Sequence, residues 1–368
     1  MIVPDASTEA PNPMKRQLLP GPSAWHGDDM SGSDSWVHPL NALELSELDD
    51  ALNGLPGRDD APGPVDKGDF PLPTLGKRLA AIGRELEDGC GIAKLTGLPV
   101  DAYEARALQQ LWYGIGSHLG TPVYQNTEAE LMRAICDEGP DVGARYGEVK
   151  TDDQGGTFLS SRARAMSNRL LRFHTDRCDV VALLCVRPAR AGGVSRIASS
   201  VAVHNAMLRR RPDLVERLFA PYYRSRFGEE AGANDAVYAL PIFGLRDGKF
   251  TSHYSRTYIE SAQLLDQVPT MDKAQWQAMD LLHEVAEEVC MEMVLEPGDM
   301  QFLNNHVTYH ARSEFDDDPR PEYKRLLYRL WLSTPDSRAL PRGHEVLWRS
   351  IGAGQRRGGI LQPASAGA

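Results

Sequence analysis

The sequence predicts a mainly β fold with flanking helices, organised around a jelly-roll core. Short stretches of strand character follow one another after residue 170, with helices inserted between some of them. These strands do not alternate regularly with helices, as the strands of a doubly wound parallel sheet do. Two packed sheets therefore fit the pattern better than one open parallel sheet.

The first third of the chain predicts an arm followed by a flank for the main sheet. Residues 1–35 are rich in Pro, Gly, Ser and Asp, so we expect a mobile N-terminal arm. Apolar residues at helical spacing then predict helices over 43–52, 77–86 and 103–118, with a short strand at Cys90–Leu95.

The segment 122–169 is irregular and interrupted by glycines. A connection this long inside a compact domain is usually functional or disordered. We expect it to cover the substrate, the alternative being a plain surface excursion.

The remainder of the chain carries the core strands. Strands are predicted at 180–186, 193–198, 222–227, 238–243, 249–253, 290–295, 300–303 and 325–332, and helices at about 200–210, 213–219 and 273–289. We expect a single domain over 36–350 and a flexible Gly/Ala/Pro-rich tail over 351–368.

Charge and composition narrow the partners and the location. The net charge of −11, from 40 basic and 51 acidic residues, argues against nucleic acid and against anionic membranes as partners. The five cysteines are widely spaced and form no C-x-x-C pair, which favours reduced thiols in the cytoplasm. We find no targeting or membrane-spanning signal. A homo-oligomer is compatible with the sequence.

His174 and Asp176 are the first candidates for a metal site. On an extended segment, side chains two residues apart share one face. One imidazole and one carboxylate are two of the three ligands of the facial triad that binds ferrous iron. His26 and Asp28 have the same spacing, but no apolar strand follows them, so we do not expect them to bind metal.

The third ligand and an anion-binding group are predicted further along. His306 and His310 are both available to complete a set of two histidines and one carboxylate. Alternation along 325–332 puts Arg325 and Arg329 on one face of a strand that is apolar on both faces. A buried guanidinium needs an anionic partner, which is either an internal Asp or Glu or the carboxylate of a ligand.

Together these motifs resemble the taurine dioxygenase family of iron(II)- and 2-oxoglutarate-dependent dioxygenases, which share a double-stranded β-helix of the jelly-roll, cupin-like type. The resemblance covers roughly residues 90–335. It rests on Phe-His174-Thr-Asp176, Ala191-Gly-Gly-Val-Ser195, Pro-Gly-Asp299 leading to Asn305 and His310, and Arg325-x-x-x-Arg329.

The resemblance implies roles for these residues. His174, Asp176 and His310 match the iron ligands, and Asn305, five residues before His310, favours it over His306. By the same resemblance Arg329 matches the arginine that grips the distal carboxylate of 2-oxoglutarate, Ser195 its hydroxyl partner, and Arg325 the other family arginine nearby. Fe(II), 2-oxoglutarate and O2 are the implied cofactors.

The implied reaction oxidises a small molecule and releases succinate and CO2. Hydroxylation is the default outcome, and desaturation or ring closure uses the same chemistry. Leu170 replaces a taurine-binding Asn, which argues against a sulfonate substrate, and the intact Asp176 argues against halogenation. A non-catalytic jelly-roll binding module is the alternative from another class.

We expect a small polar substrate, such as an amino acid or another carboxylate. The candidate contacts are Tyr124, Asn126, Tyr146 and Arg172, each weighed against an ordinary packing or surface role, and the stretch 243–258 is expected to line the same pocket.

Overall fold

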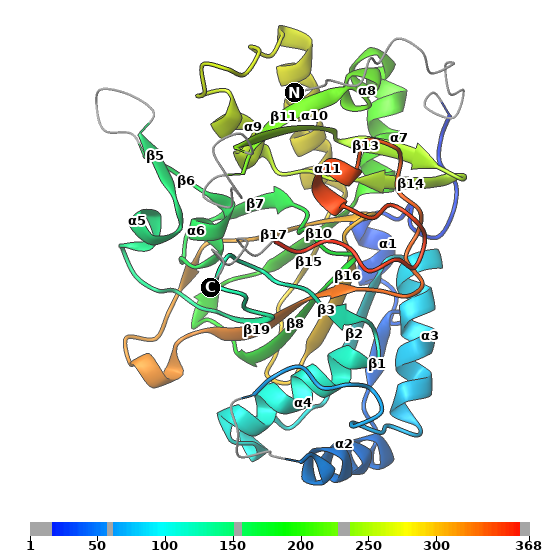
Figure 1. Ribbon diagram of the computed structural model, residues 1–368, viewed down its shortest axis with the longest axis vertical. Coiled ribbons are helices and arrows are strands. Elements are labelled where there is room, and N and C mark those ends of the chain that lie inside the picture. Colours follow the sequence, from blue (N-terminus) through cyan, green and yellow to red (C-terminus); the bar gives the residue numbers. More distant parts are fainter. Residues whose placement is uncertain (1–16, 57–61, 151–156, 227–235, 361–368) are drawn as a thin grey trace, which may run out of the picture.

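The computed structural model describes residues 17–56, 62–150, 157–226 and 236–360 of the chain. Two β-sheets lie at its centre, with helices packed on their outer faces (Figure 1). This is the predicted jelly-roll arrangement, and the predicted core strands and helices are present, with ends displaced by a few residues.

The larger sheet has the strand order β1-β2-β16-β8-β19-β3, with β4 also paired to β19. Its strands are β1 (Val37–Pro39), β2 (Ile92–Thr96), β16 (Met300–Asn304), β8 (Val180–Arg187), β19 (Leu326–Ser333), β3 (Thr121–Pro122) and β4 (Met132–Ile135). β8 lies between β16 and β19 and is antiparallel to both. Its apolar sequence is explained by this position, because both of its faces are covered.

The smaller sheet has the order β15-β10-β17-β7 and carries the metal-binding candidates. Its strands are β15 (Met291–Met293), β10 (Ser195–Ser199), β17 (Thr308–Arg312) and β7 (Leu171–His174). Inward-facing side chains from both sheets form one buried cluster that includes Val181, Leu303, Leu327 and Ile197. The site therefore lies between two layers that are held together by apolar packing.

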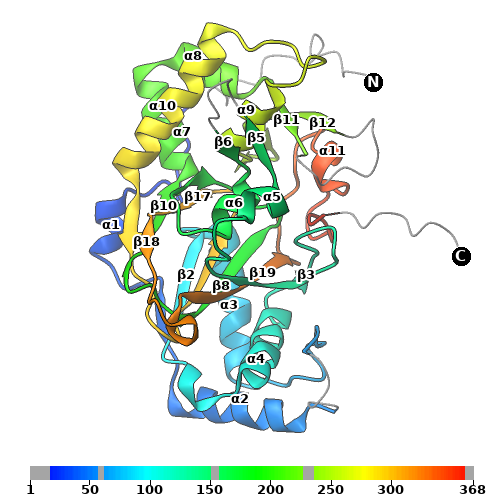
Figure 2. The same cartoon turned by 90° about the vertical axis from the view of Figure 1, so that its left-hand side faces the viewer.

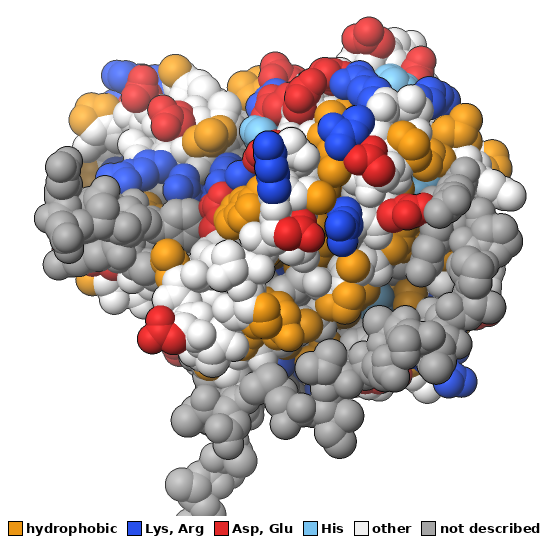
Figure 3. Space-filling view, turned by 90° about the horizontal axis from the view of Figure 1, so that it is seen from above, with side chains coloured by type: hydrophobic (Ala, Val, Ile, Leu, Met, Phe, Trp, Pro, Cys, Tyr) orange, Lys and Arg blue, Asp and Glu red, His pale blue; other side chains and the backbone are white. Residues whose placement is uncertain are grey.

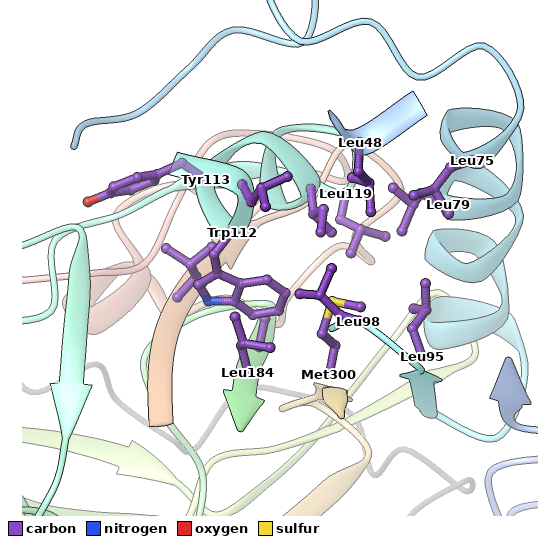
Figure 4. Close-up of a cluster of buried hydrophobic side chains, with 14 of the residues drawn as sticks. Leu48, Leu75, Leu79, Leu95, Leu98, Trp112, Tyr113, Leu119, Leu184 and Met300 are labelled. Atoms are coloured by element: carbon purple, nitrogen blue, oxygen red, sulfur yellow. The ribbon is translucent and has the colours of Figure 1, made fainter. Parts of the chain in front are cut away.

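Three helices cover the outer face of the larger sheet: α2 (Ala42–Gly54), α3 (Leu75–Asp88) and α4 (Ala105–Ser117). Figure 4 shows Trp112 of α4 beside Leu184 of β8, with Met300 of β16 close by. Leu330 and Leu332 of β19 belong to the same cluster, so one face of this strand supports the fold and the other is free to serve the site.

A second group of helices packs on the smaller sheet (Figure 2): α7 (Ser200–Arg210), α8 (Pro212–Leu218) and α10 (Lys273–Val289). Helix α10 begins at a capping box in which Asp272 and Gln275 satisfy each other's backbone N–H groups. Its apolar stripe, with Met279, Leu282 and Val285 fully buried, faces this sheet and α7.

The remaining elements connect these layers. They are α1 (Gly27–Ser31), α5 (Val142–Tyr146), β5 (Glu148–Lys150), β6 (Thr157–Leu159), α6 (Ser161–Ala165), β9 (Ala191–Gly192), β11 (Pro221–Ser225), β12 (Val237–Pro241), β13 (Phe243–Arg246), β14 (Lys249–Ser252), α9 (Arg256–Ala262), β18 (Phe315–Asp316), α11 (Glu345–Trp348) and two 3-10 turns, Val100–Ala102 and Pro321–Tyr323.

Parts of both predicted mobile ends are packed against the core. Residues 1–16 and 361–368 lie outside the described residues, but 17–35 and 351–360 are packed against the core. Trp25 and Met30 are buried in the cluster between the sheets, and Arg357 is buried beside Asp179. A few anchoring side chains thus override the mobility that Gly- and Pro-rich composition predicts.

The surface carries mixed charges. On the face seen in Figure 3, Lys and Arg side chains lie among Asp and Glu side chains. None of the helices in the described parts of the chain is long and apolar enough to cross a membrane.

Candidate metal centre

Two neighbouring strands of the smaller sheet bring the three candidate ligands together. His174 ends β7, and His310 lies opposite it on β17 as its Cα partner. Their imidazole centroids are 4.2 Å apart. Asp176 follows two residues after His174, and its carboxylate oxygens lie 3.7 Å from the Nε2 atoms of both histidines.

Each ligand presents the chemistry that a metal ion needs. The Nδ1 of His174 lies 2.9 Å from the carbonyl oxygen of Arg172, which fixes Nδ1 as the donor and leaves Nε2 with its lone pair. Burial lowers the pKa of His174, and burial followed by the neighbouring His174 lowers that of His310 to about 3, so both rings are neutral.

Asp176 is kept ionised by its surroundings. Burial alone would raise its pKa, but the neighbouring guanidinium of Arg329 and the hydrogen bond from Trp331 act against this effect, and the pKa is lowered. The indole N–H of Trp331 donates to Oδ2 at 2.8 Å, and Nη1 of Arg329 is 3.5 Å from the same oxygen. In the described residues these three side chains form the one group of His, Cys, Asp or Glu with ligand atoms close enough to share a metal ion, all within 4.8 Å.

His306, the alternative distal ligand, points elsewhere. Its Nε2 lies 2.9 Å from Oδ1 of Asp179, and its Nδ1 lies 2.8 Å from the hydroxyl of Thr251. Both ring nitrogens are therefore engaged in a separate buried network. Asn305 instead accepts from the backbone N–H of Asp176 at 3.0 Å, which ties the ligand loop to β17.

Two cavities meet at the metal centre, and His174 and Arg329 line both. Cavity A lies between the sheets and is lined by apolar residues of β8 and β19 together with Ser195, Gln301, Arg312 and Arg325. Cavity B lies on the other side of Asp176 and is polar; its lining includes Gln125, Arg133, Ser161, Arg162, Arg177, His253, Ser255, Tyr258 and Trp331.

The two predicted arginines occupy different positions. Arg329 donates through Nε to Gln125 at 2.7 Å and faces Asp176 with Nη1. The guanidinium of Arg325 is buried beside cavity A, and its Nη1 has no hydrogen-bond partner. A Cβ added at Gly193 would lie 3.5 Å from Nε of Arg325, so the glycine turn, with Gly192 and Gly193 at φ +73 and +67°, packs close to this side chain.

Ser195 lies in cavity A, where its hydroxyl accepts from Nε2 of Gln301 at 3.2 Å. The four predicted substrate contacts line neither cavity. Asn126 is bonded to Glu130, Tyr146 to Glu138, and Arg172 to Glu260. Tyr124 uses its carbonyl to accept from Ile360.

Sequence reasoning missed the neighbours of these residues. Gln125 lies beside two of the predicted contacts, and Arg177 directly follows Asp176. Strand alternation along β4 would have found Arg133, which lies opposite Arg329 in the register of β4 and β19. The stretch 243–258 was expected to line the substrate pocket, and three of its residues, His253, Ser255 and Tyr258, line cavity B.

Comparison with known proteins agrees with this geometry. The family model for "Taurine catabolism dioxygenase TauD, TfdA family" matches residues 56–331. FR-33289 synthase of Streptomyces rubellomurinus is 30% identical over 334 residues, covering 89% of this chain and 93% of that protein. The taurine hydroxylase-like protein SAT17 of Stachybotrys chartarum is 27% identical over 317 residues, covering 83% of this chain and 77% of that protein.

Solved structures share the fold. An asparagine oxygenase in complex with Fe(II), 3-hydroxyasparagine and succinate superposes with a TM-score of 0.60 at 19% identity, covering 81% of this chain and 94% of that chain. The non-heme iron oxygenase OrfP with Fe and α-ketoglutaric acid gives 0.57 at 17% identity, covering 81% and 94%. The chain therefore belongs to the TauD, TfdA family of iron(II)- and 2-oxoglutarate-dependent dioxygenases.

Proposed function

We propose that this dioxygenase hydroxylates a small polar molecule at an iron(II) held by His174, Asp176 and His310, with 2-oxoglutarate as the co-substrate. The observation that carries the proposal is the ligand set itself: two neutral imidazoles and an ionised carboxylate, with ligand atoms within 4.8 Å. This donor set suits ferrous iron and leaves positions open for the co-substrate and O2.

We assign the distal carboxylate of 2-oxoglutarate to Arg325 and Ser195, and not to Arg329. Arg325 has an unpartnered Nη1 in cavity A, whereas Arg329 is engaged by Gln125 and Asp176. The insert 314–318 lengthens the spacing from His310 to both arginines, which is why spacing alone did not separate their roles.

The residues around the iron site position and shield the reaction. When bound, iron supplies the activation of O2 that accompanies the oxidative decarboxylation of 2-oxoglutarate to succinate and CO2. Trp331 and Arg329 hold the carboxylate of Asp176 in place. The apolar walls of cavity A, including Leu183 and Leu327, keep water from the co-substrate.

Cavity B is the proposed substrate site, and described residues of the segment 122–169 contribute to its lining. Gln125, Arg133 and Arg162 of this segment line it, and Arg177 and Tyr258 complete the wall. Guanidinium and hydroxyl groups suit a substrate that carries a carboxylate, such as an amino acid. The structurally similar asparagine oxygenase and OrfP, whose complexes contain hydroxyasparagine and hydroxyarginine, are consistent with this class.

The test is a metabolite screen that reads 2-oxoglutarate-dependent succinate formation above the uncoupled background. We expect an amino acid or another small carboxylate to stimulate it, and the product to gain one oxygen atom by mass. Failure of the protein to bind Fe(II) and 2-oxoglutarate together, seen as absence of their visible charge-transfer band under anaerobic conditions, would overturn the proposal.

We further propose a cytoplasmic location and partners limited to small molecules and further copies of the chain. The five cysteines are free thiols in the structure, and this supports the proposal of a reducing compartment. Light scattering of the purified protein measures the oligomeric state, and cell fractionation measures the location.

A further inference from the structure

Arg312 is a buried arginine of β17 that points into cavity A. It lies two residues after His310, so strand alternation puts both side chains on the inner face. It is also the direct cross-strand partner of Ser195 on β10. Side chains opposite each other in an antiparallel pair are neighbours, so Arg312 stands beside the hydroxyl assigned to the co-substrate.

The two terminal nitrogens of this guanidinium differ: Nη2 forms hydrogen bonds within the protein, and Nη1 forms none. Nη2 donates to the carbonyl oxygens of Ser167 at 2.9 Å and Arg169 at 2.5 Å, which holds the segment before β7. Nη1 is buried and has no hydrogen-bond partner, and the residue as a whole is only 6% exposed. A buried charged donor left unpaired is costly, which indicates that an acceptor is missing.

Arg325 presents the same feature at the same place. Its Nη1 is also buried and unpartnered, and its side chain is 7% exposed. The two guanidinium groups pack against the ring of Phe315, with their centres 4.5 Å (Arg312) and 5.1 Å (Arg325) from its centroid. Two guanidinium groups therefore pack against one aromatic ring, and both arginines line cavity A.

No protein carboxylate in the described residues forms an ion pair with either guanidinium. Asp317 is nearby, but its Oδ1 accepts from the backbone N–H of Arg325. The ends of the two side chains in cavity A therefore have no ion-pair partner among the described residues, although Asp317 lies near Arg325.

We propose that Arg312 is a second arginine that binds the distal carboxylate of 2-oxoglutarate, together with Arg325 and Ser195. A carboxylate has two oxygens with about four acceptor positions, enough for one N–H from each guanidinium and the hydroxyl. The inference rests on the proposed function. It adds a residue that neither the motif nor the resemblance assigns.

As a consequence, cavity A should bind keto acids with a negatively charged distal group much more tightly than keto acids without one. Two buried cations are neutralised only in part by one carboxylate, so a keto acid that lacks it leaves both unpaired. 2-Oxopentanoate has the same carbon chain as 2-oxoglutarate without the distal carboxylate, and it is the probe that isolates this interaction.

The experiment measures the Kd of 2-oxoglutarate and of 2-oxopentanoate by calorimetry, anaerobically with Fe(II), for wild type, Arg312→Gln, Arg312→Lys and Arg325→Gln. The matched control is Arg320→Gln, an exposed arginine of the same insert region that pairs with Asp318. We expect Arg312→Gln to raise the Kd of 2-oxoglutarate about tenfold to a hundredfold. The Kd of 2-oxopentanoate stays within about twofold, because its complex lacks the lost contact.

The outcomes separate the alternatives. If Arg312→Gln weakens both keto acids equally, or neither, Arg312 only supports the 167–169 segment and the inference is wrong. If Arg312→Gln does not fold, Arg312→Lys decides by the same comparison, since it keeps the charge without the fork and is expected to be intermediate. If wild type does not bind 2-oxoglutarate at all, the proposed function itself fails.

Discussion

The indole N–H of Trp331 donates to Oδ2 of Asp176 at 2.8 Å. Trp331 lies on β19 of the larger sheet, whereas Asp176 follows β7 of the smaller sheet. The bond therefore spans both layers of the jelly roll and orients the one carboxylate among the three metal ligands. Partners of this kind orient a metal ligand and tune its basicity.

Loss of this bond is expected to weaken iron binding. Trp331→Phe keeps most of the buried ring but removes the donor, so we predict a fall in Fe(II) affinity of about tenfold to a hundredfold. Competition with a metal chelator measures it. Trp276→Phe is the control. Trp276 is a half-buried tryptophan of α10 that does not line either cavity, so its substitution should leave the Fe(II) affinity unchanged. Unchanged affinity in Trp331→Phe would show that Arg329 alone orients Asp176.

Separate substitutions of the two candidate distal histidines test the ligand assignment. His310→Ala removes a ligand and is expected to abolish the charge-transfer band of the Fe(II)–2-oxoglutarate complex. His306→Ala removes the bonds to Asp179 and Thr251 and leaves the three candidate ligands in place, so we expect it to lower stability but to keep the band. The reverse pattern would make His306 the ligand.

The buried ion pair between Arg357 and Asp179 is expected to stabilise the fold. Nε of Arg357 lies 2.7 Å from Oδ1 of Asp179, and both side chains are almost fully buried. Arg357→Met leaves the carboxylate without its cation, so we predict a loss of about 3–5 kcal/mol in the free energy of unfolding. Urea denaturation measures this loss.

A double-mutant cycle checks the cause. The double variant Asp179→Asn, Arg357→Met removes the charge as well as its partner, and is expected to be less destabilised than the sum of the two single variants. Strict additivity would mean that the two side chains act independently.

Stability is expected to fall in mild acid. Burial first, and then repulsion by His306 and Arg224, lowers the pKa of His344 in the folded protein to about 3, from an ordinary value of 6.5. The unfolded chain binds this proton more readily, so the stabilisation is present above pH 6.5 and is lost as the pH falls from there towards 3. Each such histidine contributes a slope of up to about 1.4 kcal/mol per pH unit.

Thermal melts between neutral pH and pH 4.5 measure this dependence. His344→Gln cannot take up the proton, and is expected to flatten the slope relative to wild type. Equal slopes in the two proteins would mean that His344 does not contribute.

The sequence predicted the three side chains that cluster as candidate metal ligands but not the residues that line cavity B, for a physical reason. His174 ends β7 and Asp176 follows two residues later, a spacing at which strand alternation predicts that two side chains share a face. Cavity B is assembled from separate strands, helices and loops, and a period within one element does not say which elements meet. Gln125 lines it while Asn126 turns away to Glu130, and only the folded chain distinguishes them.

The same limit applies to the arginines. Alternation placed Arg325 and Arg329 on one face of a strand predicted over 325–332, and both line cavity A, Arg325 from the position just before β19. It could not tell that Gln125 and Asp176 engage Arg329 whereas the Nη1 of Arg325 stays unpaired, because those partners come from distant parts of the chain. Composition likewise could not predict that Arg357 anchors the glycine-rich segment near it.

That segment has a consequence for the order in which the site is built. The backbone N–H of Gly359 donates to the carbonyl of Arg177, the residue after Asp176, and that of Ile360 donates to the carbonyl of Tyr124. The loop that carries the candidate carboxylate ligand therefore receives backbone support from a residue 182 positions later in the chain, Gly359. A chain that stops before residue 359 therefore lacks this support for the loop that carries Asp176.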